Sequence, residues 1–158
     1  MASRITGALP SNPSAQVQAV IDWMFAMCEG DWDKLESVLT EDFEATILPK
    51  SLNFPVRNKA AWIQYNKDAF PIFTDFKFHI VEIVEGVNAV AVHGCSNATT
   101  STGHPYRNEY SLFLHLTRQS DGRYRLKQEK EFIDSQYIVE FFSAEKKRQE
   151  AAGNTVYW

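Results

Sequence analysis

The sequence predicts an α+β fold in which a curved antiparallel sheet wraps around three N-terminal helices to form a cone, with one more helix at the C-terminus. Two patterns lead to this prediction. Up to Phe70, apolar residues recur at steps of three and four, which is typical of amphipathic helices. From Thr74 onward they alternate with polar residues, which is typical of strands that bury one face. Helices followed by hairpin-connected strands favour an antiparallel sheet with the helices on one side.

Three helices are expected before the long strands. Each begins at a residue whose side chain can cap a helix: Ser14, Asp31 and Asn58. Gly30 ends the first helix, because glycine readily adopts the left-handed conformation that terminates many helices. The expected ranges are 14–29, 31–40 and 58–70, with a short strand over 43–48 between the last two.

Four strands are expected after the third helix, and a final helix follows them. The expected ranges are 74–84, 89–102, 106–116 and 123–133 for the strands and 135–151 for the helix. Asp121 and Gly122 form the strongest hairpin signal in the chain and join the last two strands.

The alternation along the last strand predicts which of its side chains point inward. It places Phe132 and Asp134 on the apolar face, together with Leu126. Glu129 and Glu131 fall on the opposite face, together with basic residues.

The chain has the size and composition of one globular domain, with 158 residues of which 44% are apolar and 23% charged. We expect a flexible N-terminal arm over 1–12, a single α+β domain over 13–145 and a charged C-terminal tail over 146–158. The net charge is −4 and no basic cluster is free of acidic neighbours, which argues against a nucleic-acid partner.

Several other partners and locations are not expected from the sequence. No stretch approaches the roughly 18 apolar residues of a membrane-spanning helix, and the N-terminus lacks the apolar run of a signal peptide, so we expect a cytoplasmic protein. Cys28 and Cys95 lie far apart and are expected to be reduced. We expect no metal and no cofactor, because neither metal-ligand spacing nor a Gly-rich phosphate loop occurs.

Four segments carry a resemblance to a known family. Two of them, together with the order of elements, resemble the SnoaL-like polyketide cyclases, which have the nuclear-transport-factor-2-like fold. They are Gly30-Asp31-Trp32-Asp33-Lys34-Leu35 and Glu131-Phe132-Ile133-Asp134-Ser135. The other two look most like the small members of this family that serve fungal secondary-metabolite pathways. They are Ile47-Leu48-Pro49-Lys50-Ser51-Leu52 and Asn108-Glu109-Tyr110. The resemblance covers nearly the whole chain.

The resemblance implies an acid near the end of the last strand that moves protons during ring closure, isomerisation or dehydration. Asp134 matches that position. Related members with a steroid-isomerase-like mechanism have a carboxylate just after the first strand. Here Leu48, Pro49 and Lys50 stand at that point, so no base is expected there.

Three residues are candidates for acid–base catalysis. Asp134 has inward parity and, when buried, is a usable acid or base, but it also stands where it can cap the final helix. His93 either acts as a general base or is simply hydrogen-bonded or exposed. Glu109 has outward parity, which favours an ion pair with a basic residue such as Lys127, whereas a bulge would turn it inward.

Six residues are candidates for substrate binding. Trp62, Tyr65 and Phe73 are aromatic residues that either line the cone or pack in its core. Asn108 and Tyr110 have inward parity and can donate hydrogen bonds to a carbonyl or enolate oxygen. Phe132 shares the expected apolar face of the last strand.

These features favour a cofactor-independent acid–base enzyme, a cyclase, isomerase or dehydratase, acting on a small apolar polyketide- or terpenoid-like metabolite. The first alternative is a non-catalytic module that binds a ligand or a protein partner, which a pocket without a carboxylate of perturbed pKa would favour. The second is a structural dimer with a packed interior. A homodimer is expected through the outer face of the sheet, on which His79, Val81, Ile83 and Phe113 have the outward parity.

Overall fold

Seven strands form one sheet in the part of the chain that the structure, a computed structural model, describes, which is residues 3–156. The strands are β1 (Ile5–Gly7), β2 (Leu39–Leu48), β3 (Arg57–Asn58), β4 (Lys77–Gly86), β5 (Ala89–Thr99), β6 (Pro105–Arg118) and β7 (Tyr124–Ile133). Their order in the sheet is β1-β4-β5-β6-β7-β2-β3. The four long strands from β4 to β7 pair antiparallel, as predicted.

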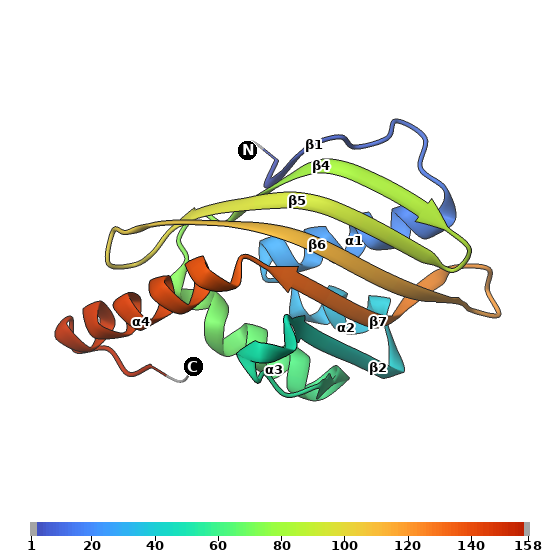
Figure 1. Ribbon diagram of the computed structural model, residues 1–158. Helices are drawn as coiled ribbons and strands as arrows, with labels where there is room; N and C mark the ends of the chain where they lie inside the picture. Colours follow the sequence, from blue (N-terminus) through green and yellow to red (C-terminus); the bar gives the residue numbers. More distant parts are fainter. Residues whose placement is uncertain (1–2, 157–158) are drawn as a thin grey trace.

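The helices lie mainly on the side toward which the sheet curves (Figure 1). They are α1 (Ala15–Glu29), α2 (Trp32–Val38), α3 (Lys59–Ala69) and α4 (Ser135–Ala151), with two short 3-10 helices, η1 (Lys50–Leu52) and η2 (Phe70–Ile72). The sheet stays open, and α4 runs away from the end of β7 (Figure 1). The predicted α+β fold with a C-terminal helix is confirmed.

Helix starts follow local capping chemistry. Ser14, Asp31 and Asn58 each accept a hydrogen bond from a backbone N–H in the first turn of α1, α2 and α3. Gly30 ends α1 with φ of 68°, in the left-handed region. The second helix is shorter than expected, because Leu39 already adopts extended backbone and begins β2.

The edges of the sheet differ from the prediction. β1 pairs parallel with β4, and β2 pairs parallel with β7, so the sheet is mixed. Ile5 is only 1% exposed, so the expected flexible arm does not include β1. At the other end, Glu145 and Gln149 are buried and α4 continues to Ala151, so residue 145 is not a structural boundary. Met1, Ala2, Tyr157 and Trp158 lie outside the described residues.

Two β-bulges reverse the side-chain alternation that the sequence suggested. In β7, Leu126 pairs with Leu116 and Gln128 pairs with His115, so Lys127 is an extra residue. Beyond it, odd-numbered residues face the concave side. A similar shift in β4 between Ile80 and Glu82 turns Ile83 toward the core. No helix of the described residues is long and apolar enough to cross a membrane.

Candidate functional site

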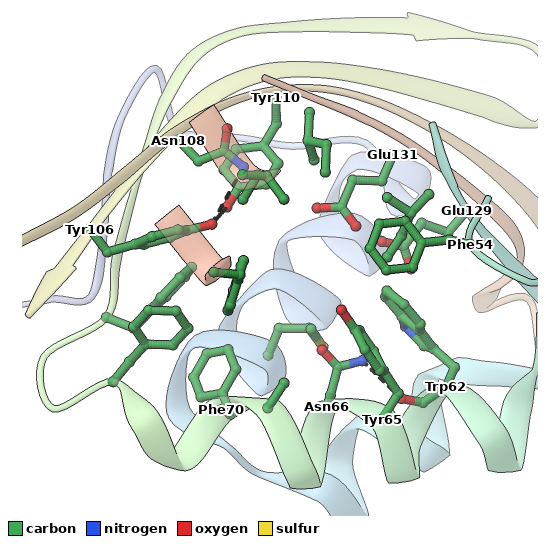
Figure 2. A pocket seen from close by; sticks show the side chains of 18 of the residues that line it. Phe54, Trp62, Tyr65, Asn66, Phe70, Tyr106, Asn108, Tyr110, Glu129 and Glu131 are labelled. Atoms are coloured by element: carbon green, nitrogen blue, oxygen red, sulfur yellow. Dashed lines mark hydrogen bonds between the residues drawn. The ribbon is translucent and has the colours of Figure 1, made fainter. Parts of the chain in front are cut away.

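A cavity of about 690 Å³ lies between the concave face of the sheet and the helices α1, α3 and α4 (Figure 2). Most of its wall is apolar or aromatic. The apolar lining includes Trp23, Met24, Met27, Cys28, Trp62, Ala69, Phe70, Phe73, Phe76 and Phe78. The packed interior expected of a purely structural dimer is therefore not found, and the volume suits a small organic molecule.

Two glutamates of β7 enter this apolar wall. Glu129 and Glu131 lie beyond the bulge at Lys127, which turns both side chains to the concave face. Glu129 is 2% exposed and lies deeper, whereas Glu131 is half-buried and points into the cavity (Figure 2). Within residues 3–156, no hydrogen bond or ion pair to the Glu131 carboxylate is present.

Burial controls the protonation of both carboxyls. It raises the pKa of Glu131 from 4.5 to about 7, because water no longer solvates the charged form. The pKa of Glu129 is raised well above 4.5, first by burial and then by the nearby charge of Glu131. Burial therefore favours the protonated form of both carboxyls relative to the same groups in water.

A chain of hydroxyl groups lies on another part of the wall. Ser96 Oγ and the Tyr110 hydroxyl are 2.9 Å apart, and the Tyr110 and Tyr106 hydroxyls are 3.0 Å apart. Asn108 Nδ2 donates to the Tyr106 hydroxyl at 3.4 Å. Burial raises the pKa of both tyrosines, so they stay protonated near neutral pH and act as hydrogen-bond donors.

The number of protons in this chain of hydroxyl groups leaves one hydrogen-bond donor unused. Three hydroxyl protons serve two contacts between hydroxyls, so one proton is left for another acceptor. If Ser96 donates to Tyr110 and Tyr110 to Tyr106, the remaining proton belongs to Tyr106, which lines the cavity. The opposite direction would leave the buried Ser96 proton without an acceptor, at a cost in free energy. In the first direction Tyr106 presents an O–H donor to a ligand; if Ser96 and Tyr106 both donate to Tyr110, Tyr110 presents it, and it also lines the cavity.

Aromatic residues of α3 form the wall across from Glu131. The Trp62 and Tyr65 rings stack with centroids 5.6 Å apart. Figure 2 shows Tyr65 pointing into the cavity, on the opposite side from Glu131. Burial raises the pKa of Tyr65, the charge of Glu131 raises it further, and the Arg57 guanidinium opposes both.

Five of the six residues expected to bind substrate line the cavity: Trp62, Tyr65, Phe73, Asn108 and Tyr110. The Asn108 side chain also accepts hydrogen bonds from the backbone N–H groups of Glu109 and Asp134, which fixes its amide. Phe132 does not line it. It is 43% exposed on the convex face, with its ring 6.2 Å from that of Phe113, because the bulge reversed its direction.

The expected inward orientation of Asp134 is wrong for the same reason. Asp134 is exposed, and its Oδ1 accepts a hydrogen bond from the Tyr137 backbone N–H at 3.1 Å at the start of α4. The helix-cap interpretation, which the sequence had left open, describes its position.

His93 and Glu109 also lie on the convex face, outside the cavity. His93 Nε2 is 2.7 Å from Glu109 Oε1, so the two candidates form a pair with each other. The outward parity of Glu109 is as predicted, but its partner is His93, because Lys127 instead pairs with Asp42 at 3.1 Å.

Sequence reasoning missed Glu129, Glu131 and Tyr106. The two glutamates belong to the run Gln128-Glu129-Lys130-Glu131, which is typical of a solvated strand face. Glu129 and Glu131 share the parity of the apolar Ile133, and this was the one sign in the sequence that their side chains could face inward. Tyr106 has the same parity along β6 as Asn108 and Tyr110, but its hydroxyl becomes notable only when the structure places these two side chains beside it.

Comparisons with known proteins identify the family and the fold. The SnoaL-like domain family matches residues 17–126. The monooxygenase ptaG of Pestalotiopsis fici is 25% identical over 138 residues, covering 86% of this chain and 94% of that protein. The pinacolase BvnE from Penicillium brevicompactum is 26% identical, with a TM-score of 0.71, over 89% of this chain and 97% of that one. PrhC from Penicillium brasilianum, 19% identical with a TM-score of 0.73, shares the fold over 88% of this chain and 90% of its own.

Proposed function

The chain belongs to the SnoaL-like domain family, and on that premise we propose that it catalyses proton transfer, without a cofactor, on a small apolar polyketide- or terpenoid-like metabolite held in the cavity. The observation that carries this proposal is Glu131, a carboxyl that points into an apolar cavity and has a pKa of about 7. A group with that pKa both accepts and releases a proton efficiently near neutral pH. A non-catalytic binding module would have no need for such a group.

The arrangement supports a reaction that begins next to a carbonyl group. The Glu131 carboxylate removes a proton from the carbon beside the carbonyl, and the C–H electron pair moves to form an enolate. The Tyr106 hydroxyl donates a hydrogen bond to the oxygen on which negative charge develops. Return of the proton from Glu131 to a different carbon gives an isomer. Attack of the enolate carbon on a second carbonyl forms a C–C bond, and the oxygen of that carbonyl then takes the proton from Glu131 to give a cyclised product. No oxidant is consumed.

The likeness to BvnE agrees with this class of chemistry. BvnE is described as a pinacolase, and a pinacol rearrangement proceeds by proton transfer to and from oxygen without a change in overall oxidation state. Cyclisation, isomerisation and dehydration each need the same pair of roles, an acid and a base within one apolar cavity. The substrate and the choice among these reactions belong to the proposal.

The relative ptaG supports a second candidate, since it is described as a monooxygenase. The same deprotonation by Glu131 would give an electron-rich enolate whose carbon transfers two electrons to molecular oxygen and bonds to it. Protonation gives a hydroperoxide that holds both oxygen atoms, and loss of water from that carbon leaves one of them in a new carbonyl group. An oxygen electrode separates the two candidates, because proton transfer alone consumes no oxygen.

The proposal is tested with a model ketone in place of the natural substrate. Wild-type protein should catalyse deuterium incorporation at the carbon beside the carbonyl of 2-tetralone in D₂O, followed by NMR. Glu131→Gln should lose about 10²–10⁴-fold of this rate. Glu109→Gln is the matched control, since Glu109 is on the neighbouring strand but faces outward. Equal rates in wild type and Glu131→Gln would refute the proposal.

We also propose that the protein forms a homodimer through the convex face of the sheet. Four apolar residues of this face are 43–55% exposed: Val81, Val84, Phe113 and Phe132. Covering them with a second copy would remove apolar surface from water. Ile83, which the sequence placed in this surface, packs toward the core instead.

A further inference from the structure

Two basic side chains line the cavity. Arg57 follows β2 in β3 and is half-buried, and Lys146 is on α4 and is exposed, yet both line the cavity. Neither forms an ion pair with an acidic residue among residues 3–156. Val139 and Ser143 occupy the preceding turns on the same face of α4 and are also exposed lining residues, which places the opening beside this helix.

Arg57 is held in place by aromatic rings. Its guanidinium carbon is 4.0 Å from the centroid of Tyr65 and 5.7 Å from that of Phe54. Arg57 Nη1 donates a long hydrogen bond of 3.4 Å to the Pro55 carbonyl oxygen. Among the described residues, the Arg57 side chain makes no other hydrogen bond. A guanidinium carries five N–H donors, so most of them remain available to a ligand.

The interior and the opening therefore favour opposite parts of a ligand. The inner wall is apolar and carries the carboxyls of Glu129 and Glu131, which offer no positive charge to an anion, so an acidic group is least favourable there. At the opening, Arg57 can contact a carboxylate or phosphate through two N–H donors, and Lys146 adds a second positive charge.

We propose that the cavity takes an amphiphilic acid, an apolar ring system that enters first and carries a carboxylate or phosphate, which Arg57 binds while the positive charge of Lys146 favours its approach. This inference rests on the proposed function only in treating the cavity as the substrate site. It also fixes the orientation of the substrate, because the acidic group stays at the opening while the reacting carbon reaches Glu131.

The test measures binding of two dyes that differ by one anionic group. 8-Anilinonaphthalene-1-sulfonate carries a sulfonate, and N-phenyl-1-naphthylamine is the same molecule without it. Each is titrated by fluorescence at pH 6 into wild type, Arg57→Gln, Arg57→Lys, Lys146→Gln and the control Lys147→Gln. Lys147 is the next residue on α4, and it is exposed and does not line the cavity.

Arg57→Gln should weaken binding of the sulfonate dye about 10-fold, the loss expected for a charge-assisted hydrogen bond. Lys146→Gln should weaken it about threefold, while Arg57→Lys should restore part of the affinity and Lys147→Gln should leave it unchanged. The neutral dye should bind all variants within a factor of two and displace the sulfonate dye competitively. Equal losses for both dyes, no loss in Arg57→Gln, or non-competitive displacement would each overturn the inference.

Competition with 1-naphthoate and 1-naphthyl phosphate then shows which acidic group is preferred, and methyl 1-naphthoate is the neutral reference. Both anions should compete better than the ester in wild type, and this advantage should disappear in Arg57→Gln. Glu131→Gln should keep the preference for anions, whatever its catalytic rate. Failure of this inference is thus distinguishable from failure of the proposed function.

Discussion

Glu131 is the residue whose chemistry depends most on its surroundings. A carboxylate in water titrates near 4.5, but in this cavity burial moves the pKa to about 7. Burial raises the pKa of the deeper Glu129 well above 4.5, which disfavours a second negative charge beside Glu131. On the convex face, where Glu109 lies, a carboxylate is not enclosed by apolar side chains.

Tyr106 should support catalysis as a hydrogen-bond donor. Tyr106→Phe keeps the ring that packs against Phe73 and Phe141 but removes the proton aimed at the substrate oxygen. The rate of deuterium exchange into 2-tetralone should fall about 10²-fold or more, as when one donor of an oxyanion site is lost. Tyr124→Phe, outside the cavity, is the control. An unchanged rate in Tyr106→Phe would remove this residue from the mechanism.

The raised pKa of Glu131 should also appear in the stability of the protein. Between pH 4.5 and about 7 the folded protein keeps a proton that the unfolded chain has released. Stability therefore falls as the pH rises through this window, because the folded state binds more protons. Thermal unfolding between pH 5 and pH 8 should show the decline in wild type and a smaller one in Glu131→Gln. Parallel curves for the two proteins would contradict the assigned pKa.

At the scale of elements, the bulge in β7 decides which acids meet the cavity. One extra residue, Lys127, reverses the direction of every later side chain in the strand. It brings Glu129 and Glu131 inward and sends Phe132 and Asp134 outward. The candidate catalytic group, Glu131, therefore lies on the same short segment as Asp134, which caps α4.

Asp134 is expected to stabilise α4 without taking part in catalysis. Asp134→Ala should cost about 1 kcal/mol of stability because the first turn loses its cap, whereas Asp134→Asn should cost little. Both variants should exchange deuterium into 2-tetralone at the wild-type rate. Calorimetry and the exchange assay together decide, and a loss of exchange in Asp134→Asn would return this residue to the active site.

How much the sequence predicts differs between local and register-dependent features. Ser14, Asp31 and Asn58 act on the backbone within their own turn, so their caps could be predicted from the sequence. The position of a bulge depends on the packing of both neighbouring strands, and the charged run around Glu129 gave no sign of it. Aromatic and amide residues on α3 and β6 were placed correctly because those elements keep an unbroken period.

At the scale of the whole molecule, the concave face of the sheet lines the cavity and the convex face is the proposed dimer surface. Light scattering after size-exclusion chromatography should give about twice the 18.1 kDa of one chain at micromolar concentration. Phe113→Glu should produce a monomer that remains folded, because the patch around Phe132 would then carry a charge. Val87→Glu, in the turn after β4, is the control. A monomeric wild type would refute the dimer.

The most direct test of the proposed acid–base role is the pH dependence of a base-catalysed reaction in the cavity. 5-Nitrobenzisoxazole is an apolar probe that opens when a base removes its C–H proton, and the product is followed by absorbance. The rate with wild-type protein should rise with pH along a titration curve centred near 7, because Glu131 accepts a proton only in its ionised form. Glu131→Gln should show no such curve, while Glu109→Gln should match wild type. A curve centred near 4.5, or one that persists in Glu131→Gln, would contradict the assignment of Glu131 as the proton-transferring group.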